Sequence, residues 1–164
     1  MNRDSVDMII EQWRKEVPDL STTAMAIFGR LQRINKHVGR SLGNNFSRFN
    51  LNSGEFDVLA TLRRSGEPYM LKPTDLYNQL MVTSGAMTNR IDTLEKKSLV
   101  MRVNDVSDRR TVYVKLTEKG LKIINEAIYE HVNEEEKLLE CLSKEDADML
   151  NIILKKIVCK FEKE

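Results

Sequence analysis

The apolar spacing of this chain changes from helical to alternating at residue 99, and this change constrains the fold most strongly. Between residues 53 and 97, apolar side chains recur three or four positions apart in three short segments, which predicts three helices. A short extended run, 69–71, separates the first two. From 99 to 116, two β-branched runs flank a seven-residue, mostly polar loop, which predicts a β-hairpin.

Capping residues support the starts of these helices. Asn52 and Glu55 have the spacing of a capping box, in which each side chain bonds the backbone of the other. Thr83 or Ser84 is placed to cap the third helix, and Thr117 to cap a long helix after the hairpin. The order helix, short strand, helix, tight turn, helix and hairpin predicts a winged helix-turn-helix.

The third helix of this motif carries small and polar residues in its first two turns. The major groove of DNA admits one α-helix, and the N-terminal part of that helix reaches the base edges. Small side chains permit close approach, and hydroxyl and amide groups can bond bases or phosphates. The predicted DNA-contacting residues are Thr83, Ser84, Gly85, Ala86, Met87, Thr88 and Asn89.

The hairpin loop carries two arginines at its tip. A hairpin of this size reaches the neighbouring minor groove, whose negative potential attracts arginine. Asp108, Arg109 and Arg110 are the predicted wing residues. Taken alone, the helix face and the loop are each as consistent with ordinary solvated surface as with DNA binding. Together and in this order they predict binding to double-stranded DNA.

Amphipathic helices are predicted on both sides, over 5–16 and 24–42 and then over 121–142 and a last helix with its apolar stripe at 149–161, with a turn over 43–50. They either pack on their own domain or form a homodimer interface, which would suit two recognition helices on a pseudo-palindrome. We predict a mainly α fold with a small β-hairpin wing (α+β). Its parts are N-terminal helices in 1–50, a DNA-binding domain in 51–120 and C-terminal dimerisation helices in 121–164.

Charge and hydropathy narrow the class of protein. The formal net charge is +1, which excludes a histone-like chain, but residues 84–120 hold eight basic and five acidic side chains. No apolar run approaches the roughly 20 residues that span a bilayer, and the N-terminus lacks the pattern of a secretory signal. We therefore expect a cytoplasmic protein without a membrane partner.

In these elements the chain resembles the MarR family of bacterial transcription regulators. The residues that carry the resemblance are 83–97, then Asp108-Arg109-Arg110, and then Leu116-Thr117-Glu118-Lys119-Gly120. The resemblance implies an obligate dimer that binds pseudo-palindromic promoter DNA and usually represses. It also implies that Arg110 enters the minor groove and that Asp108 holds it. Two residues depart from the family pattern, Val106 in place of proline and Ser98 in place of glycine.

A narrower resemblance points to the urate-responsive, PecS-like subgroup. It rests on the added N-terminal helix and on segments 56–60, 62–64 and 84–88. It implies that Trp13, Asp57, Arg64 and Arg90 bind urate or a related small aromatic anion. Asp57 and Arg64 lie seven residues apart and so share a helix face, whereas Arg63 is expected to turn away. The alternatives are packing for Trp13 and a structural ion pair for the charged residues.

Three other classes of function remain open from the sequence. Cys141 and Cys159 would serve an oxidant sensor, although both occur among apolar helical residues, where cysteine is more often inert packing. An enzyme would have His131 with Glu134 and Glu135 as metal ligands, but no catalytic motif is present, and we expect no catalytic residue, metal or cofactor. A pure protein-interaction module would keep the terminal helices and need no basic wing.

Overall fold

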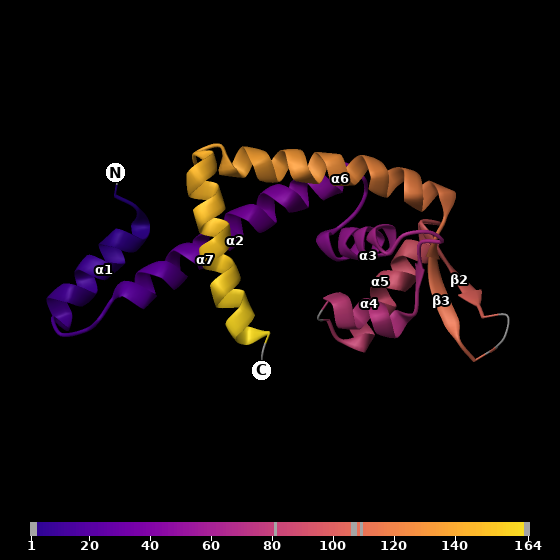
Figure 1. Ribbon diagram of the computed structural model, residues 1–164, viewed down its shortest axis with the longest axis horizontal. Coiled ribbons are helices and arrows are strands. Elements are labelled where there is room, and N and C mark those ends of the chain that lie inside the picture. Colours follow the sequence, from indigo (N-terminus) through magenta and orange to yellow (C-terminus); the bar gives the residue numbers. More distant parts are fainter. Residues whose placement is uncertain (1–2, 81, 106–107, 109, 163–164) are drawn as a thin grey trace. The chain divides into compact units, whose positions relative to one another are not determined.

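The computed structural model describes residues 3–80, 82–105, 108 and 110–162. It divides into two compact units, Met1–Ser41 and Leu42–Glu164, which we describe separately as unit 1 and unit 2. The elements confirm the predicted mainly helical fold with a small antiparallel sheet (Figure 1). They are α1 (Ser5–Glu16), α2 (Thr23–Ser47), α3 (Ser53–Arg64), β1 (Met70–Leu71), α4 (Pro73–Leu80), α5 (Ser84–Lys96), β2 (Val100–Asn104), β3 (Val112–Leu116), α6 (Glu118–Leu139) and α7 (Lys144–Phe161).

Unit 1 is α1 packed against the first part of α2. Val6 and Ile10 are buried between the helices, and Asp4 caps α1 by accepting hydrogen bonds from the backbone of Val6 and Asp7. Arg30 of α2 then bonds both carboxylates, at 2.8 Å to Asp4 and 2.6 Å to Asp7. Polar contacts at the N-terminus of α1 therefore fix how it lies on α2.

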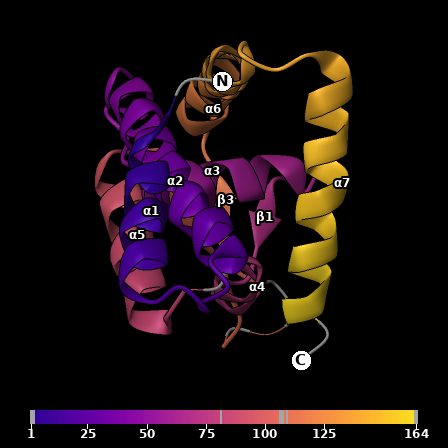
Figure 2. The same cartoon turned by 90° about the vertical axis from the view of Figure 1, so that its left-hand side faces the viewer.

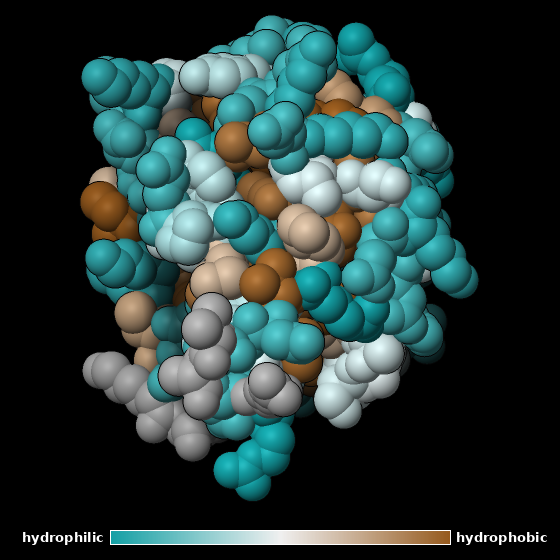
Figure 3. Space-filling model, turned by 90° about the vertical axis from the view of Figure 1, so that its right-hand side faces the viewer, coloured by the Kyte–Doolittle hydropathy of each residue, from teal (hydrophilic) through white to brown (hydrophobic). Residues whose placement is uncertain are grey.

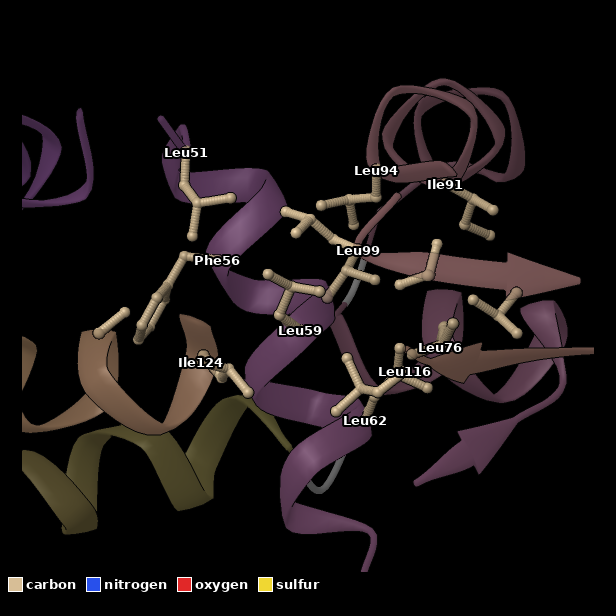
Figure 4. Packing of buried hydrophobic residues seen from close by; sticks show 14 of the residues in the cluster. Leu51, Phe56, Leu59, Leu62, Leu76, Ile91, Leu94, Leu99, Leu116 and Ile124 are labelled. Atoms are coloured by element: carbon tan, nitrogen blue, oxygen red, sulfur yellow. The ribbon is translucent and has the colours of Figure 1, made fainter. Parts of the chain in front are cut away.

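The core of unit 2 surrounds α3, because both long faces of this short helix are buried. Val58, Leu59 and Leu62 have no exposed surface, and they meet Leu94 of α5 and Ile124 of α6 in one apolar cluster (Figure 4). The predicted capping box is present, with Asn52 and Glu55 bonding each other's backbone at 2.9 Å. Glu55 also accepts from Nζ of Lys97 at 2.8 Å, which holds the end of α5 against the start of α3.

The sheet is antiparallel, in the order β1-β3-β2. β2 and β3 pair over five residues from Val100 with Leu116 to Asn104 with Val112, so the hairpin predicted from the β-branched runs is confirmed. β1 adds the short pairing of Met70 with Lys115 and Leu71 with Val114. This third strand attaches the base of the hairpin to the helices of unit 2.

The prediction of a turn over 43–50 is wrong for most of that segment, because α2 continues to Ser47. Tertiary contacts outweigh the poor helix propensity of glycine and asparagine there. Phe46 is buried in the core, and Nδ2 of Asn45 donates to the carbonyl of Glu130 in α6 at 2.9 Å. A turn over 48–50 follows the helix, and Asn50 at its end takes the left-handed conformation with φ 56°.

Ser98 occupies the left-handed position that ends α5, with φ 60°. The amide of Ser98 donates to the carbonyl of Glu95 at 2.8 Å, and that of Leu99 to the carbonyl of Leu94 at 2.9 Å. These two bonds form a Schellman motif, in which glycine is the usual residue at this position. Serine in place of glycine therefore has a local conformational cost at the junction between α5 and β2.

Gly120 lies where the first turn of α6 meets the start of β2. A Cβ atom added to it would lie 1.9 Å from the carbonyl oxygen of Leu99, which itself accepts hydrogen bonds from Thr117. No side chain fits there without moving backbone. This contact explains why the motif after the hairpin contains glycine.

α7 has a different environment from the other helices of unit 2. None of its residues is buried, and Figure 2 shows it standing clear of the helices around the core. Apolar side chains along it are exposed, namely Met149, Leu150, Ile152, Ile153, Val158 and Phe161. Within the described part of the chain, no helix combines the length and the apolar character needed to cross a membrane.

Candidate functional site

The first two turns of α5 present a polar, exposed face. Thr83 is the N-cap, since its side chain accepts from the amide of Ala86 at 3.3 Å. Thr83, Ser84, Gly85, Thr88 and Asn89 are exposed, and Ala86 is half-buried. Figure 3 shows the end of the molecule that carries the hairpin, where hydrophilic side chains cover most of the surface. The helix start is therefore open to a large polar partner.

Met87 does not belong to this exposed face, and its predicted contact with DNA is wrong. Its side chain is 2% exposed and packs in the core with Ile91 and Leu94. The helical period already places 87, 91 and 94 on one side of the helix, opposite the polar residues. Met87 anchors α5 to unit 2 while its neighbours face outward.

The hairpin tip is organised by Asp108. Its carboxylate accepts from the backbone amide of Arg110 and from the hydroxyl of Thr111, both at 3.0 Å. The hydrogen bond from the Arg110 amide is the main cause that lowers the pKa of Asp108 below its ordinary value. Nε of Arg110 lies 3.6 Å from Asp108, while the arginine side chain is 97% exposed. Arg109, also predicted as a wing residue, lies outside the described residues.

Arg102 joins the hairpin to α5. It lies in β2, where Nη2 donates to Asp92 at 2.5 Å and Nη1 donates to Glu95. The backbone amide of Arg102 also donates to Glu95, at 3.3 Å. An arginine that the sequence pattern did not indicate thus ties the wing to the second half of α5, the helix whose start is exposed.

A cavity of about 370 Å³ opens beside the C-terminal half of α3. It lies within unit 2, between α3, the end of α4 and the first half of α6. Its wall has an apolar part, including Phe56, Leu80 and Ile128, and a charged part that includes Asp57 and Arg64. The ring of Phe56 stacks on Phe46 at 4.2 Å between centroids, which fixes the aromatic side of the wall.

Two of the three predicted charged residues line this cavity, and the third, Arg90, lies next to one of them without lining it. Asp57 and Arg64 both line it, and Asp57 faces Arg90 of α5, whose Nη1 lies 4.0 Å from Oδ2 of the aspartate. Partial burial raises the pKa of Asp57, and the charges of Arg90, His131 and Arg64 oppose that rise. Nη1 of Arg90 is buried without a hydrogen-bond acceptor among the described atoms. Arg64 donates to Gln79 at 3.3 Å.

Arg63 was expected to turn away, but it also lines the cavity, where its Nε is occupied by Asn125 at 2.7 Å and its guanidinium lies over Tyr69. Trp13 belongs to unit 1 and is 42% exposed, so its part in ligand binding stays a prediction.

His131, which the sequence suggested only as a possible metal ligand, lines the cavity. Its ring contacts Phe56 at 4.8 Å between centroids, and its Nε2 lies 3.3 Å from Glu135. Periodicity could have placed it on the same face of α6 as Ile124 and Ile128, since these are spaced by four and three residues. Among the described residues, no group of three or more potential ligands is arranged to hold a metal ion.

The cysteines differ from expectation in their exposure. Cys141 is exposed in the turn between α6 and α7, and Cys159 is half-buried in α7. They are therefore not core residues of unit 2.

A helix-turn-helix with a polar, exposed start to its second helix, followed by a hairpin with an exposed arginine, is a winged helix-turn-helix, the fold class of many transcription regulators. The chain belongs to the MarR family, whose model matches residues 51–112. It is 38% identical to the HTH-type transcriptional regulator PecS of Dickeya dadantii, over 93% of this chain and 92% of that protein. The resemblance noted from the sequence is thereby confirmed.

Solved structures agree with this assignment. AbsC, a MarR family transcriptional regulator from Streptomyces coelicolor, superposes with a TM-score of 0.78 at 25% identity, covering 88% of this chain and 98% of that one. A mutant of MarR from E. coli, complexed with operator DNA, gives a TM-score of 0.71 at 26% identity, covering 88% and 96%.

Proposed function

We propose that this protein is a ligand-responsive, sequence-specific DNA-binding repressor in the cytoplasm, released from pseudo-palindromic promoter DNA by a small aromatic anion such as urate. The observation that carries the proposal is the exposed polar start of α5 in the same unit as a hairpin with the exposed Arg110 at its tip, with Arg102 tying the hairpin to α5. The similarity to a MarR protein in complex with operator DNA supports it.

DNA recognition divides between helix and wing. The exposed hydroxyl and amide groups of Ser84, Thr88 and Asn89 contact base edges or phosphates in the major groove, and the N-terminus of α5 favours a phosphate. Arg110 enters the adjacent minor groove from a loop that Asp108 keeps in shape. A helix capped by Thr83 and anchored by Met87 presents these groups without reorganisation.

The exposed apolar side chains of the terminal helices support a homodimer. α7 buries no residue in its own chain, although it repeats apolar side chains every three or four positions. Exposed apolar surface of this extent marks a site of protein association. A twofold pair would place two α5 helices on the two halves of a pseudo-palindromic site.

The cavity in unit 2 suits the proposed anion. Its volume of about 370 Å³ lies within the range of small-molecule pockets. An aromatic ring would pack on Phe56, and the guanidinium of Arg64 would bond an anionic edge of the ligand. Trp13 remains a predicted ligand-binding residue, as the narrower resemblance implies.

Arg90 provides the coupling between ligand and DNA. Without ligand, Asp57 holds Arg90 and with it α5 in the pose that binds DNA. An anion taken up by Arg64 and Arg90 competes for Arg90 and repels Asp57. Because Arg90 is on α5, its displacement changes the spacing of the two DNA-reading helices. The ligand must prefer the displaced pose, and allosteric couplings of this kind amount to about 1–3 kcal/mol.

The test is selection of bound fragments from the genome of the source organism, with and without urate, xanthine or salicylate. The proposal expects enrichment of a pseudo-palindromic sequence that one of these anions abolishes. Enrichment that none of the anions changes would remove the ligand mechanism and leave the DNA function. Failure to retard any genomic fragment at low salt would favour a protein-interaction module instead.

A further inference from the structure

The guanidinium of Arg90 lies directly on the α-carbon of Gly54. A Cβ atom built on Gly54 would be 2.5 Å from Nε of Arg90, 2.7 Å from Cζ and 3.0 Å from Nη2. Such distances are far inside van der Waals contact. The planar group can therefore occupy this position only because residue 54 has no side chain.

Backbone conformation does not require glycine at this position. Gly54 is in the first turn of α3, and its φ is not in the left-handed region. Alanine is the better helix former, so glycine here weakens α3 locally. What glycine provides is room for a side chain that comes from another helix.

The contact brings α5 next to the charged wall of the cavity. Asp57 follows Gly54 by three residues and so lies on the same side of α3, one turn further on. Its Oδ2 is 4.0 Å from Nη1 of Arg90, and Asp57 itself lines the cavity. The Nη1 atom has no hydrogen-bond acceptor among the described atoms, so packing on Gly54 and the charge of Asp57 hold the guanidinium.

We infer that Gly54 is a positioning residue: its bare α-carbon sets the guanidinium of Arg90 beside Asp57 and thereby connects the DNA-reading helix α5 to the cavity. The positioning itself stands on the geometry, and its regulatory consequence rests on the proposed function. In Gly54→Ala the flexible arginine side chain moves, rather than the backbone, and the variant folds. Arg90 is then lifted away from Asp57.

The first experiment measures the pKa of the Asp57 carboxyl by carbon-detected NMR titration of the whole protein. Arg90 lowers this pKa, so lifting the guanidinium away raises it. We expect Gly54→Ala to raise the pKa of Asp57 in the same direction as Arg90→Gln. In the double variant, Gly54→Ala should add no further shift, because the group that it displaces is absent.

The matched control is Gly43→Ala, another helical glycine of unit 2, around which a Cβ atom would meet no other atom within 4 Å. It should leave the pKa of Asp57 unchanged. Equal pKa values in wild type and Gly54→Ala would overturn the inference. So would a shift that persists in the Arg90→Gln background, since the effect would then not act through Arg90.

The second experiment measures DNA affinity with and without urate, using a fragment from the genomic selection. Typical allosteric ligands change affinity about 5- to 150-fold. In Gly54→Ala we expect the ligand-free affinity to fall towards that of the urate-bound wild type, and the remaining response to urate to fall towards onefold. An unchanged response would contradict the regulatory role. Should wild type itself ignore urate, the proposed ligand fails, while the Asp57 titration still decides the positioning role of Gly54.

Discussion

Arg102 of β2 donates a hydrogen bond from Nη2 to Asp92 of α5 at 2.5 Å, and this pair ties the wing to the DNA-reading helix. The same guanidinium also donates to Glu95 from Nη1. In the proposed complex, α5 and the wing reach neighbouring grooves of the DNA. Arg102 links these two elements without itself being assigned a contact with DNA.

Arg102→Met should weaken DNA binding more than it weakens the fold. The arginine is 39% exposed, so its ion pairs contribute about 0–1 kcal/mol to the free energy of unfolding, reduced further by solvent screening. Loss of the link between the wing and α5, in contrast, affects every complex formed. Urea denaturation and DNA titration measure the two effects. Arg48→Met, which breaks the exposed pair with Glu130, is the control and should leave DNA affinity intact.

Arg110→Ala should weaken binding to all DNA sequences that the protein binds. The side chain is 97% exposed and carries an uncovered positive charge at the hairpin tip. Removal of one cation–DNA contact reduces the slope of log affinity against log salt by about 1. Titrations at several salt concentrations measure that slope. Lys122→Ala on α6 controls for the loss of charge alone, and a slope equally reduced in both variants would contradict the assignment of Arg110 to the interface.

Arg64→Ala should separate ligand response from DNA binding. Arg64 lines the cavity and donates to Gln79, and it is distant in sequence from the exposed residues of α5. We expect nearly unchanged DNA affinity and a blunted release by urate, measured by fluorescence anisotropy. Gln79→Ala removes only the partner of Arg64 and should retain the response. A folded Arg64→Ala protein that no longer bound DNA would show that the two sites are not separate.

Ser98→Gly should stabilise the protein by about 1 kcal/mol. A non-glycine residue in the left-handed conformation costs about 1–2 kcal/mol. The substitution recovers less than this, because glycine loses more conformational freedom on folding than serine does. Urea denaturation gives the change in the free energy of unfolding. Ser65→Gly, at a helix end with φ −70°, should give no such gain.

Gly120→Ala should prevent stable folding, in contrast to Gly54→Ala. At Gly120 the obstacle is the backbone carbonyl of Leu99, 1.9 Å from the added carbon, whereas at Gly54 it is the far end of a flexible side chain. Circular dichroism and thermal unfolding distinguish the two variants. A Gly120→Ala protein with wild-type thermal stability would show that the start of α6 can move away from β2.

The local pattern of the sequence was sufficient wherever a short segment determines its own structure. The Asn52–Glu55 capping box and the hairpin between 100 and 116 both depend on residues close in the chain. The joint position of Asp57 and Arg64 at one cavity also followed from their seven-residue spacing.

Features that depend on distant partners were missed or placed wrongly. The extension of α2 to Ser47 depends on the contact of Asn45 with Glu130, 85 residues away in sequence. Arg63 reaches the cavity wall because Asn125 and Tyr69 hold it there. The contact of Arg90 with Gly54 joins two helices whose approach no single-segment pattern indicates. The position of Met87 could have been recognised from its helical spacing.

Because α7 buries no residue within its own chain, the fraction of protein that is dimeric should depend on the protein concentration in the cell. In the proposed homodimer, the apolar side chains of this helix leave water only when two chains meet, so ordering of the C-terminus and pairing become one event. At low concentration the dimer would then dissociate and release promoter DNA while the core of each chain stays folded. Synthesis rate and dilution by growth would adjust repression alongside any effector.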